Sequence, residues 1–120
     1  ELARLREAHV AWVRATRDTG FIPEQMLRDF AAGSSEHGYA RSAAYRLEEC
    51  LATARLVEQG GAAVPALVAA LRSDYGPVRY WAAVGLGIVG TDDAAASALE
   101  PLLRDVHAEV ALAAAESLIR

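Results

Sequence analysis

The sequence predicts an all-α fold, an α-solenoid of about seven helices in antiparallel pairs. The first observation is an internal repeat, because the pattern from Leu67 to Leu86 returns from Leu99 to Leu118, 32 positions later. A period in the thirties with two helices per repeat is typical of helical solenoids. The second observation is a composition rich in alanine, in which aromatic residues make up only 7%. Small side chains favour closely packed helices over a β-sheet.

The two copies of the repeat agree at positions that would form the core of a helix pair. The matched pairs are Leu67 and Leu99, Leu71 and Leu103, Arg72 and Arg104, Val78 and Val110, Ala82-Ala83 and Ala114-Ala115, and Leu86 and Leu118. Stacked units of this kind present surface to partners and seldom catalyse reactions on their own.

Length and charge limit the classes of protein to which the chain can belong. Its 120 residues fit one domain with a core of its own. The net charge of −4 gives no electrostatic reason to expect a nucleic acid partner. No apolar run approaches the roughly 20 residues that a membrane span needs, so we expect no membrane partner. Because the chain begins with Glu1 and not with methionine, we expect it to be part of a longer polypeptide.

Residues 1–38 are predicted to form an N-terminal helical hairpin that leads into the repeats. Apolar residues at helical spacing predict an amphipathic helix over residues 1–16, which Gly20 would end in a left-handed conformation. A second helix is expected over residues 23–31, with a proline in its first turn. Residues 33–38 are rich in glycine and serine and predict the loop before the repeats.

Residues 39–120 are predicted to hold the helical repeats, as part of one overall domain. A long helix is expected over residues 40–58, and a pair of glycines would stop it. Its predicted buried stripe consists of Ala43-Ala44, Leu47, Cys50-Leu51, Ala54 and Val57. The next helix is expected over residues 63–72, where Pro65 is tolerated in the first turn.

The last three helices have clear start signals. A proline begins the helix over residues 77–89, which also carries two glycines that we expect to permit close helix–helix approach, Gly85 and Gly87. Thr91 or Asp92 would cap the next helix, which is expected to end near residue 104. The final helix is expected over residues 108–119.

The unit from Leu71 to Leu86 resembles a HEAT repeat. That family has a leucine-rich first helix, an Asp-Pro-type turn, a Val-Arg pair, and a second helix with an Ala-Ala-x-x-Leu pattern. The corresponding residues here are Asp74, Pro77, Val78-Arg79, Ala82-Ala83 and Leu86. The second copy departs from the pattern, since Ala111 stands where Arg79 stood. The resemblance implies a HEAT-like α-α superhelix.

A second resemblance lies upstream of the repeats. His9 and Trp12, with the run Thr16-Arg17-Asp18-Thr19-Gly20-Phe21-Ile22-Pro23-Glu24, resemble the segment that closes the catalytic region of many bacterial arylsulfatase-family enzymes. Some of those enzymes carry a HEAT-like C-terminal extension with a stretch like Val78 to Ala83. The resemblance implies that this chain is the C-terminal region of a bacterial sulfatase-family protein.

The catalytic residues of sulfatases are absent from this chain. Their nucleophile is a cysteine in a Cys-x-Pro/Ala-x-Arg context, matured to formylglycine, and it works beside a calcium site. Cys50 has no arginine four residues later, so we expect a buried residue on the third helix. The resemblance therefore implies a non-catalytic accessory region without a cofactor. The formylglycine and calcium would lie in a catalytic domain outside this chain, in a periplasmic or extracellular protein.

An alternative stays open, which is a free-standing HEAT-repeat scaffold that binds another protein; we would then expect a cytoplasmic location. The partner is the catalytic domain of the parent chain in the first case and a separate protein in the second. A third class, a HEAT-like DNA-repair enzyme, is disfavoured by the acidic charge balance.

Four aromatic residues are candidates for an interaction surface, namely Trp12, Phe21, Tyr80 and Trp81. Each either covers a neighbouring helix or contacts a partner. Asp74 and Arg79 are expected to form a structural ion pair that ties the turn to the second helix of the repeat.

No metal or catalytic site is predicted. His9, His37 and His107 are scattered and have no second ligand at metal-binding spacing. The last helix carries an apolar stripe without a cap, made of Val110, Ala114 and Leu118. Solenoid ends normally need a polar capping face, so we expect self-association into a homo-oligomer through the open ends.

Overall fold

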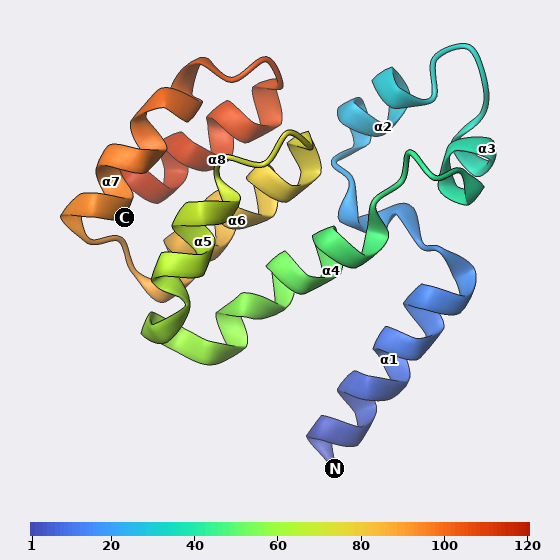
Figure 1. Cartoon of the computed structure of the whole chain (residues 1–120), viewed down its shortest axis with the longest axis horizontal. Helices are drawn as coiled ribbons and strands as arrows, with labels where there is room; N and C mark the ends of the chain where they lie inside the picture. Colours follow the sequence, from blue (N-terminus) through green and yellow to red (C-terminus); the bar gives the residue numbers. More distant parts are fainter. The chain divides into compact units, whose positions relative to one another are not determined.

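The computed structural model describes every residue from Glu1 to Arg120 and consists of helices joined by turns (Figure 1). The all-α fold class is confirmed. The chain divides into two compact units, Glu1–Leu47 and Glu48–Arg120. The α-helices are α1 (Leu2–Thr16), α2 (Glu24–Phe30), α3 (Glu36–Arg41), α4 (Leu47–Arg55), α5 (Val64–Ala70), α6 (Gly76–Val89), α7 (Asp93–Leu99) and α8 (Ala108–Leu118). Three 3-10 segments are η1 (Thr19–Phe21), η2 (Leu56–Ala63) and η3 (Glu100–Arg104).

The first unit has a small apolar core of its own. Val13 of α1 and Met26 of α2 are almost fully buried. Three aromatic rings lie in a row, with centroids 5.5 Å apart between Phe30 and Tyr39 and 6.1 Å apart between Tyr39 and Tyr45. These contacts join α2 to the segment around α3, as helices with one apolar face require.

Arg17 ends α1, and the prediction that Gly20 would do so is wrong. Arg17 adopts the left-handed conformation, with φ 50° and ψ 51°, which costs a residue with a side chain about 1 kcal/mol. Its guanidinium offsets this cost by donating hydrogen bonds to three backbone carbonyls, those of Ala40, Ser42 and Tyr45. Gly20 lies in η1 instead.

The long helix predicted over residues 40–58 is interrupted. α3 ends before residues 42–46, which are irregular, and α4 follows them. The carbonyls of this segment point toward Arg17, which holds the backbone away from helical geometry. Ala43 and Ala44 are therefore exposed and not part of a buried stripe. The predicted burial is confirmed for Leu47, Cys50 and Leu51.

The loop predicted over residues 33–38 is shorter than expected. Gly33 has a positive φ of 87°, and Ser35 then caps α3 by accepting a hydrogen bond of 2.9 Å from the amide of Gly38. The boundary between the two compact units falls after Leu47.

In the second unit, α5 pairs with α6, and α6 packs against α8 (Figure 1). The repeated apolar positions form its core, as expected for two stacked copies of one pattern. Buried members are Leu67, Leu71, Ala82, Ala83, Leu86, Leu99, Val110 and Ala114.

Two glycines of α6 let other elements approach closely. A Cβ on Gly85 would lie 2.8 Å from Cδ2 of Leu67, and one on Gly87 would lie 2.6 Å from Oγ of Ser117. Ser117 of α8 donates a hydrogen bond of 2.6 Å to the carbonyl of Ala83. α8 thus rests directly on the backbone of α6, and the predicted packing role is confirmed.

The helix ends follow from local chemistry. Pro77 lies in the first turn of α6, where its missing amide costs nothing. Asp92 caps α7 by accepting a hydrogen bond of 2.7 Å from the amide of Ala95. Because Pro101 lacks an amide donor, the chain continues as η3 and not as the longer helix that we predicted to residue 104. None of the helices combines the length and the apolar character that crossing a membrane requires.

Candidate interaction site

An ion pair between Arg79 and Asp105 connects the two repeats of the second unit. Nε of Arg79 donates to Oδ2 of Asp105 at 2.8 Å, and Nη2 donates to Oδ1 at 3.1 Å. Nη1 donates to the carbonyl of Ser73 at 2.9 Å. The side chains of Arg79 and Asp105 are only 14% and 7% exposed. The bidentate contact therefore ties the turn before α6 to the turn before α8.

The carboxyl group of Asp105 titrates below its ordinary range. Its partial burial alone would raise the pKa, but hydrogen bonds from Arg79 and from the amide of His107 outweigh that effect and lower it. The positive charges of Arg79 and His107 lower the pKa further. Asp105 is thus held as a carboxylate that holds Arg79 in place.

Our prediction that Asp74 would pair with Arg79 stays a prediction. The guanidinium of Arg79 binds the carboxylate of Asp105, and Asp74 lies exposed in the turn whose Ser73 carbonyl Arg79 contacts. A guanidinium on α6 faces the following repeat, which packs on that side of the helix. Sequence reasoning missed Asp105; the signal that could have found it is an acidic residue in the corresponding turn of the next repeat.

Tyr80 and Trp81 are both half-buried and contact each other. Their ring centroids are 5.4 Å apart, and the planes meet at 85°, an edge-to-face contact. Residues that cover a neighbouring helix are typically half-buried. Part of each of these two side chains stays accessible. Their role in a partner contact stays a prediction.

The first half of α1 presents an apolar face that no other element of the first unit covers. Every residue from Glu1 to His9 is exposed, and this part of α1 extends away from α2 and α3 (Figure 1). Leu2, Leu5 and Trp12 are exposed by more than half of their area. Their spacing of three and seven residues places them on one side of the helix, which we call the α1 face. The sequence predicted only Trp12 as an interaction residue; Leu2 and Leu5 required the observation that no other element of the first unit covers them.

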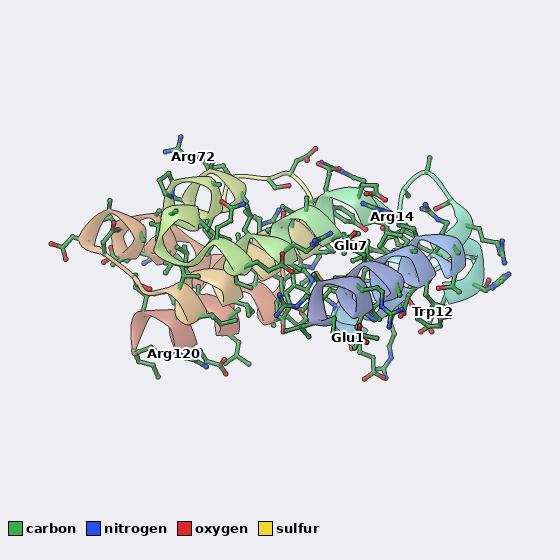
Figure 2. The ribbon with its side chains drawn as sticks, turned by 90° about the horizontal axis from the view of Figure 1, so that it is seen from below. Glu1, Glu7, Trp12, Arg14, Arg72 and Arg120 are labelled. Carbon is green, nitrogen blue, oxygen red and sulfur yellow. The ribbon has the colours of Figure 1, made fainter.

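Of the three residues of the α1 face, Trp12 is the one nearest the C-terminal end of α1 (Figure 2). His9 stacks against its ring, with centroids 6.4 Å apart. An open hollow of about 360 Å³ beside Trp12 is bordered by Asp18 and His37. An indole ring next to polar groups and an open surface is a common anchor of protein interfaces.

Residues of the run from Thr16 to Glu24 connect the C-terminal end of α1 to later segments of the first unit. Arg17 holds three carbonyls, as described above, and its guanidinium lies 5.3 Å from the centroid of the Tyr45 ring. The hydroxyl of Tyr45 donates to the carbonyl of Asp18. Phe21 is half-buried and does not extend the α1 face. The contacts described here give the run a structural role.

The three histidines and Cys50, the remaining candidates for a metal or catalytic site, do not form a common cluster. His9 is used in the ring contact described above, and His37 accepts a hydrogen bond of 2.9 Å from Nε of Arg41. His107 precedes α8. No three His, Cys, Asp or Glu side chains gather as a metal-binding cluster would. The thiol of Cys50 is fully buried.

The last helix has an open stripe on a different side from the one we predicted. Val110 and Ala114 are buried within the unit, and Leu118 is half-buried. Leu112 and Ile119 face outward instead, with 61% and 85% of their area exposed. The apolar stripe read from sequence therefore faces the core, and its exposed neighbour forms the outer edge of the unit.

Comparison with known proteins supports this architecture over most of the chain. The sequence pattern of the family described as HEAT repeats matches residues 27–119. Neither the curated proteins nor the solved structures contain a match to the chain.

Proposed function

Because this chain belongs to the family of HEAT repeats, we propose that it is a non-catalytic interaction module, and more specifically the C-terminal accessory region of a bacterial sulfatase-family hydrolase. HEAT repeats form helical scaffolds that present surface to partners. In this proposal the chain binds a partner, and catalysis belongs to a domain outside it.

The observation that carries the sulfatase assignment is the run from Thr16 to Glu24, followed directly by helical repeats. That run resembles the segment with which arylsulfatase-family catalytic regions close. The side chains of Arg17 and Asp18 bind backbone groups within the first unit. This is consistent with a segment that positions helices and takes no part in ester cleavage.

The α1 face is the surface by which the module would contact the catalytic domain. Leu2, Leu5 and Trp12 are exposed apolar side chains on a half-helix with no covering element in its own unit. An apolar stripe of this kind indicates a partner surface. In the sulfatase assignment the occupant is the catalytic domain of the same polypeptide, because α1 lies in the segment that resembles the close of the catalytic region.

The sequence of the native polypeptide upstream of Glu1 tests the assignment. We expect a chain several times longer, with a Cys-x-Pro/Ala-x-Arg motif near its start. A parent without that motif would refute the sulfatase assignment. Hydrolysis of an aryl sulfate by the purified 120-residue chain would refute the separate statement that the module is non-catalytic.

A free-standing HEAT-repeat scaffold is the second candidate, and the extent of the family match over residues 27–119 favours it. It would bind another protein through its helix faces. It differs from the first candidate in its parent polypeptide, which would contain further helical repeats and no hydrolase domain.

A further inference from the structure

The open hollow beside Trp12 lies between two segments of the first unit that are distant in the sequence. One wall comes from the end of α1 and the residues after it, including Asp18, and the other comes from α3, including Glu36. The carbonyl of Ala40 in α3 accepts a hydrogen bond from Arg17, which fixes α3 against the end of α1. The two walls are therefore held in place before a partner binds.

Two carboxylates border the hollow, and neither forms an ion pair. Oδ1 of Asp18 accepts a hydrogen bond of 2.9 Å from the amide of Gly20, and no cation contacts this side chain. Glu36 is exposed in the first turn of α3 and has no partner of opposite charge. The two negative charges are thus available to a cation from outside the unit.

Two cations lie near the hollow, and each already has partners within the first unit. The guanidinium of Arg17 donates to three backbone carbonyls and lies over the ring of Tyr45. Nε of Arg41 donates to Nε2 of His37, which accepts with an unprotonated nitrogen, so this ring adds no positive charge. The carboxylates are therefore the charged groups of the hollow that a partner can still bind.

Trp12 supplies an aromatic surface next to these carboxylates, and more than half of its area is exposed. His9 stacks on the ring from one turn before Trp12, whereas the hollow continues past Thr16, one turn after it. The hollow and the His9 ring thus lie on opposite sides of Trp12 along the helix. An indole beside carboxylates attracts cations, and it suits a guanidinium best, because that planar group stacks on rings while its N–H groups donate to carboxylates.

The size of the hollow favours a single side chain over a free small molecule. Its volume of about 360 Å³ is near the lower limit, roughly 300 Å³, of the pockets that bind drug-sized ligands. Such pockets enclose most of their ligand, whereas this hollow is open. A side chain carried by a partner surface needs no enclosure, because the contacts around it contribute to binding. The exposed leucines of the α1 face, which also contains Trp12, can make such contacts.

We propose that the hollow binds an arginine side chain of the protein surface that covers the α1 face. The guanidinium stacks on Trp12 and donates to Asp18 and Glu36, while apolar side chains around the arginine cover Leu2 and Leu5. This inference rests on the proposed function in one respect, namely that the α1 face is a partner surface. It adds the chemistry by which that partner is recognised.

NMR titration of the 120-residue chain with N-acetylarginine amide tests the proposal, with the indole N–H signal of Trp12 as the readout. Because an exposed ring and exposed carboxylates contribute little each, we expect a dissociation constant on the order of 10 mM. N-acetylcitrulline amide has nearly the same shape without the charge and should not bind.

Substitutions that remove charge and keep shape separate the site from simple loss of folding. Asp18→Asn and Glu36→Gln should each weaken binding of the arginine amide about threefold, and together about tenfold. Glu24→Gln is the matched control and should leave binding unchanged, because Glu24 is also an exposed glutamate in the first turn of a helix but does not border the hollow. Equal binding of the two amides, or equal weakening by Glu24→Gln and Glu36→Gln, would overturn the proposal.

Amide hydrogen exchange of α1 in the native polypeptide separates this inference from the proposed function. Protected α1 amides without a shift of Trp12 on addition of the arginine amide would overturn the arginine as the occupant and leave the partner surface intact. Unprotected α1 amides would refute the partner surface, and the identification of its occupant with it, even where the arginine amide binds.

Discussion

Replacement of Asp105 by asparagine is the sharpest test of how the second unit is held together. The side chain is 7% exposed and makes two hydrogen bonds with Arg79. Asp105→Asn keeps the shape of the side chain but leaves a guanidinium with 14% exposure without its counter-charge. Loss of one partner from a buried ion pair costs about 3–5 kcal/mol. Because Arg79 keeps its bond to the Ser73 carbonyl, we expect the lower end, about 3 kcal/mol.

Urea unfolding at pH 7 measures this loss. Trp81 reports on the second unit when Trp12, the other tryptophan, is replaced by phenylalanine. With a slope of about 1 kcal/mol per molar urea, 3 kcal/mol moves the midpoint by about 3 M. Asp74→Asn is the comparison, because the sequence paired Asp74 with Arg79; we expect it to cost less than Asp105→Asn, since Asp74 is exposed and Asp105 is not. A larger loss for Asp74→Asn than for Asp105→Asn would refute the assignment of the pair.

The same pair gives a pH dependence with a defined sign. The pKa of Asp105 is lowered in the folded state, so its contribution is fully present above the pKa of an unfolded aspartate, about 3.9. The contribution is lost as the pH falls through the lower, folded-state pKa. The stability difference between the native chain and Asp105→Asn should therefore be constant from pH 7 to about pH 5 and shrink below about pH 4. A difference that grows on acidification contradicts this account.

Two further substitutions probe close contacts. Gly87→Ala should destabilise the second unit by about 1–3 kcal/mol in urea unfolding, because its Cβ would meet Ser117, whereas Gly61→Ala, with open space around it, should not. Arg17→Met should destabilise the first unit by about 3 kcal/mol, because it removes three hydrogen bonds from one guanidinium. Faster amide hydrogen exchange around α3 would report it, and equal exchange in Arg17→Met and the exposed-site control Arg6→Met would contradict it.

The repeated half of the chain follows from local signals. Pro77 and Asp92 mark helix starts that the structure confirms, since a proline at the first turn and an aspartate cap act within a few residues of themselves. Gly85 and Gly87 mark close approach, because a Cβ at either position would force the side chain of Leu67 or Ser117 to shift. Helical periodicity also placed Leu47 and Cys50 in the core.

The packing of the first unit could not be predicted, because the contacts that determine it join residues that are far apart in the sequence. Arg17 binds carbonyls more than twenty positions later in the chain. No local sequence pattern predicts that a guanidinium will bind three distant carbonyls. The same contacts interrupt the predicted long helix. Asp105 was missed for a similar reason, since its partner lies one repeat earlier. The α1 face was predicted only in part. Apolar residues at helical spacing, such as Leu2 and Leu5, predict burial, and only the structure shows that they are exposed.

Hydrogen exchange along α1 tests the interaction function most directly. No other element of the first unit covers the first half of α1, so we expect its amides to exchange rapidly in the isolated 120-residue chain. In the native polypeptide the α1 face should lie against the catalytic domain, and the amides between Leu2 and His9 should be protected. Equal exchange in the isolated chain and in the native polypeptide would contradict the account, because the α1 face would then have no partner there.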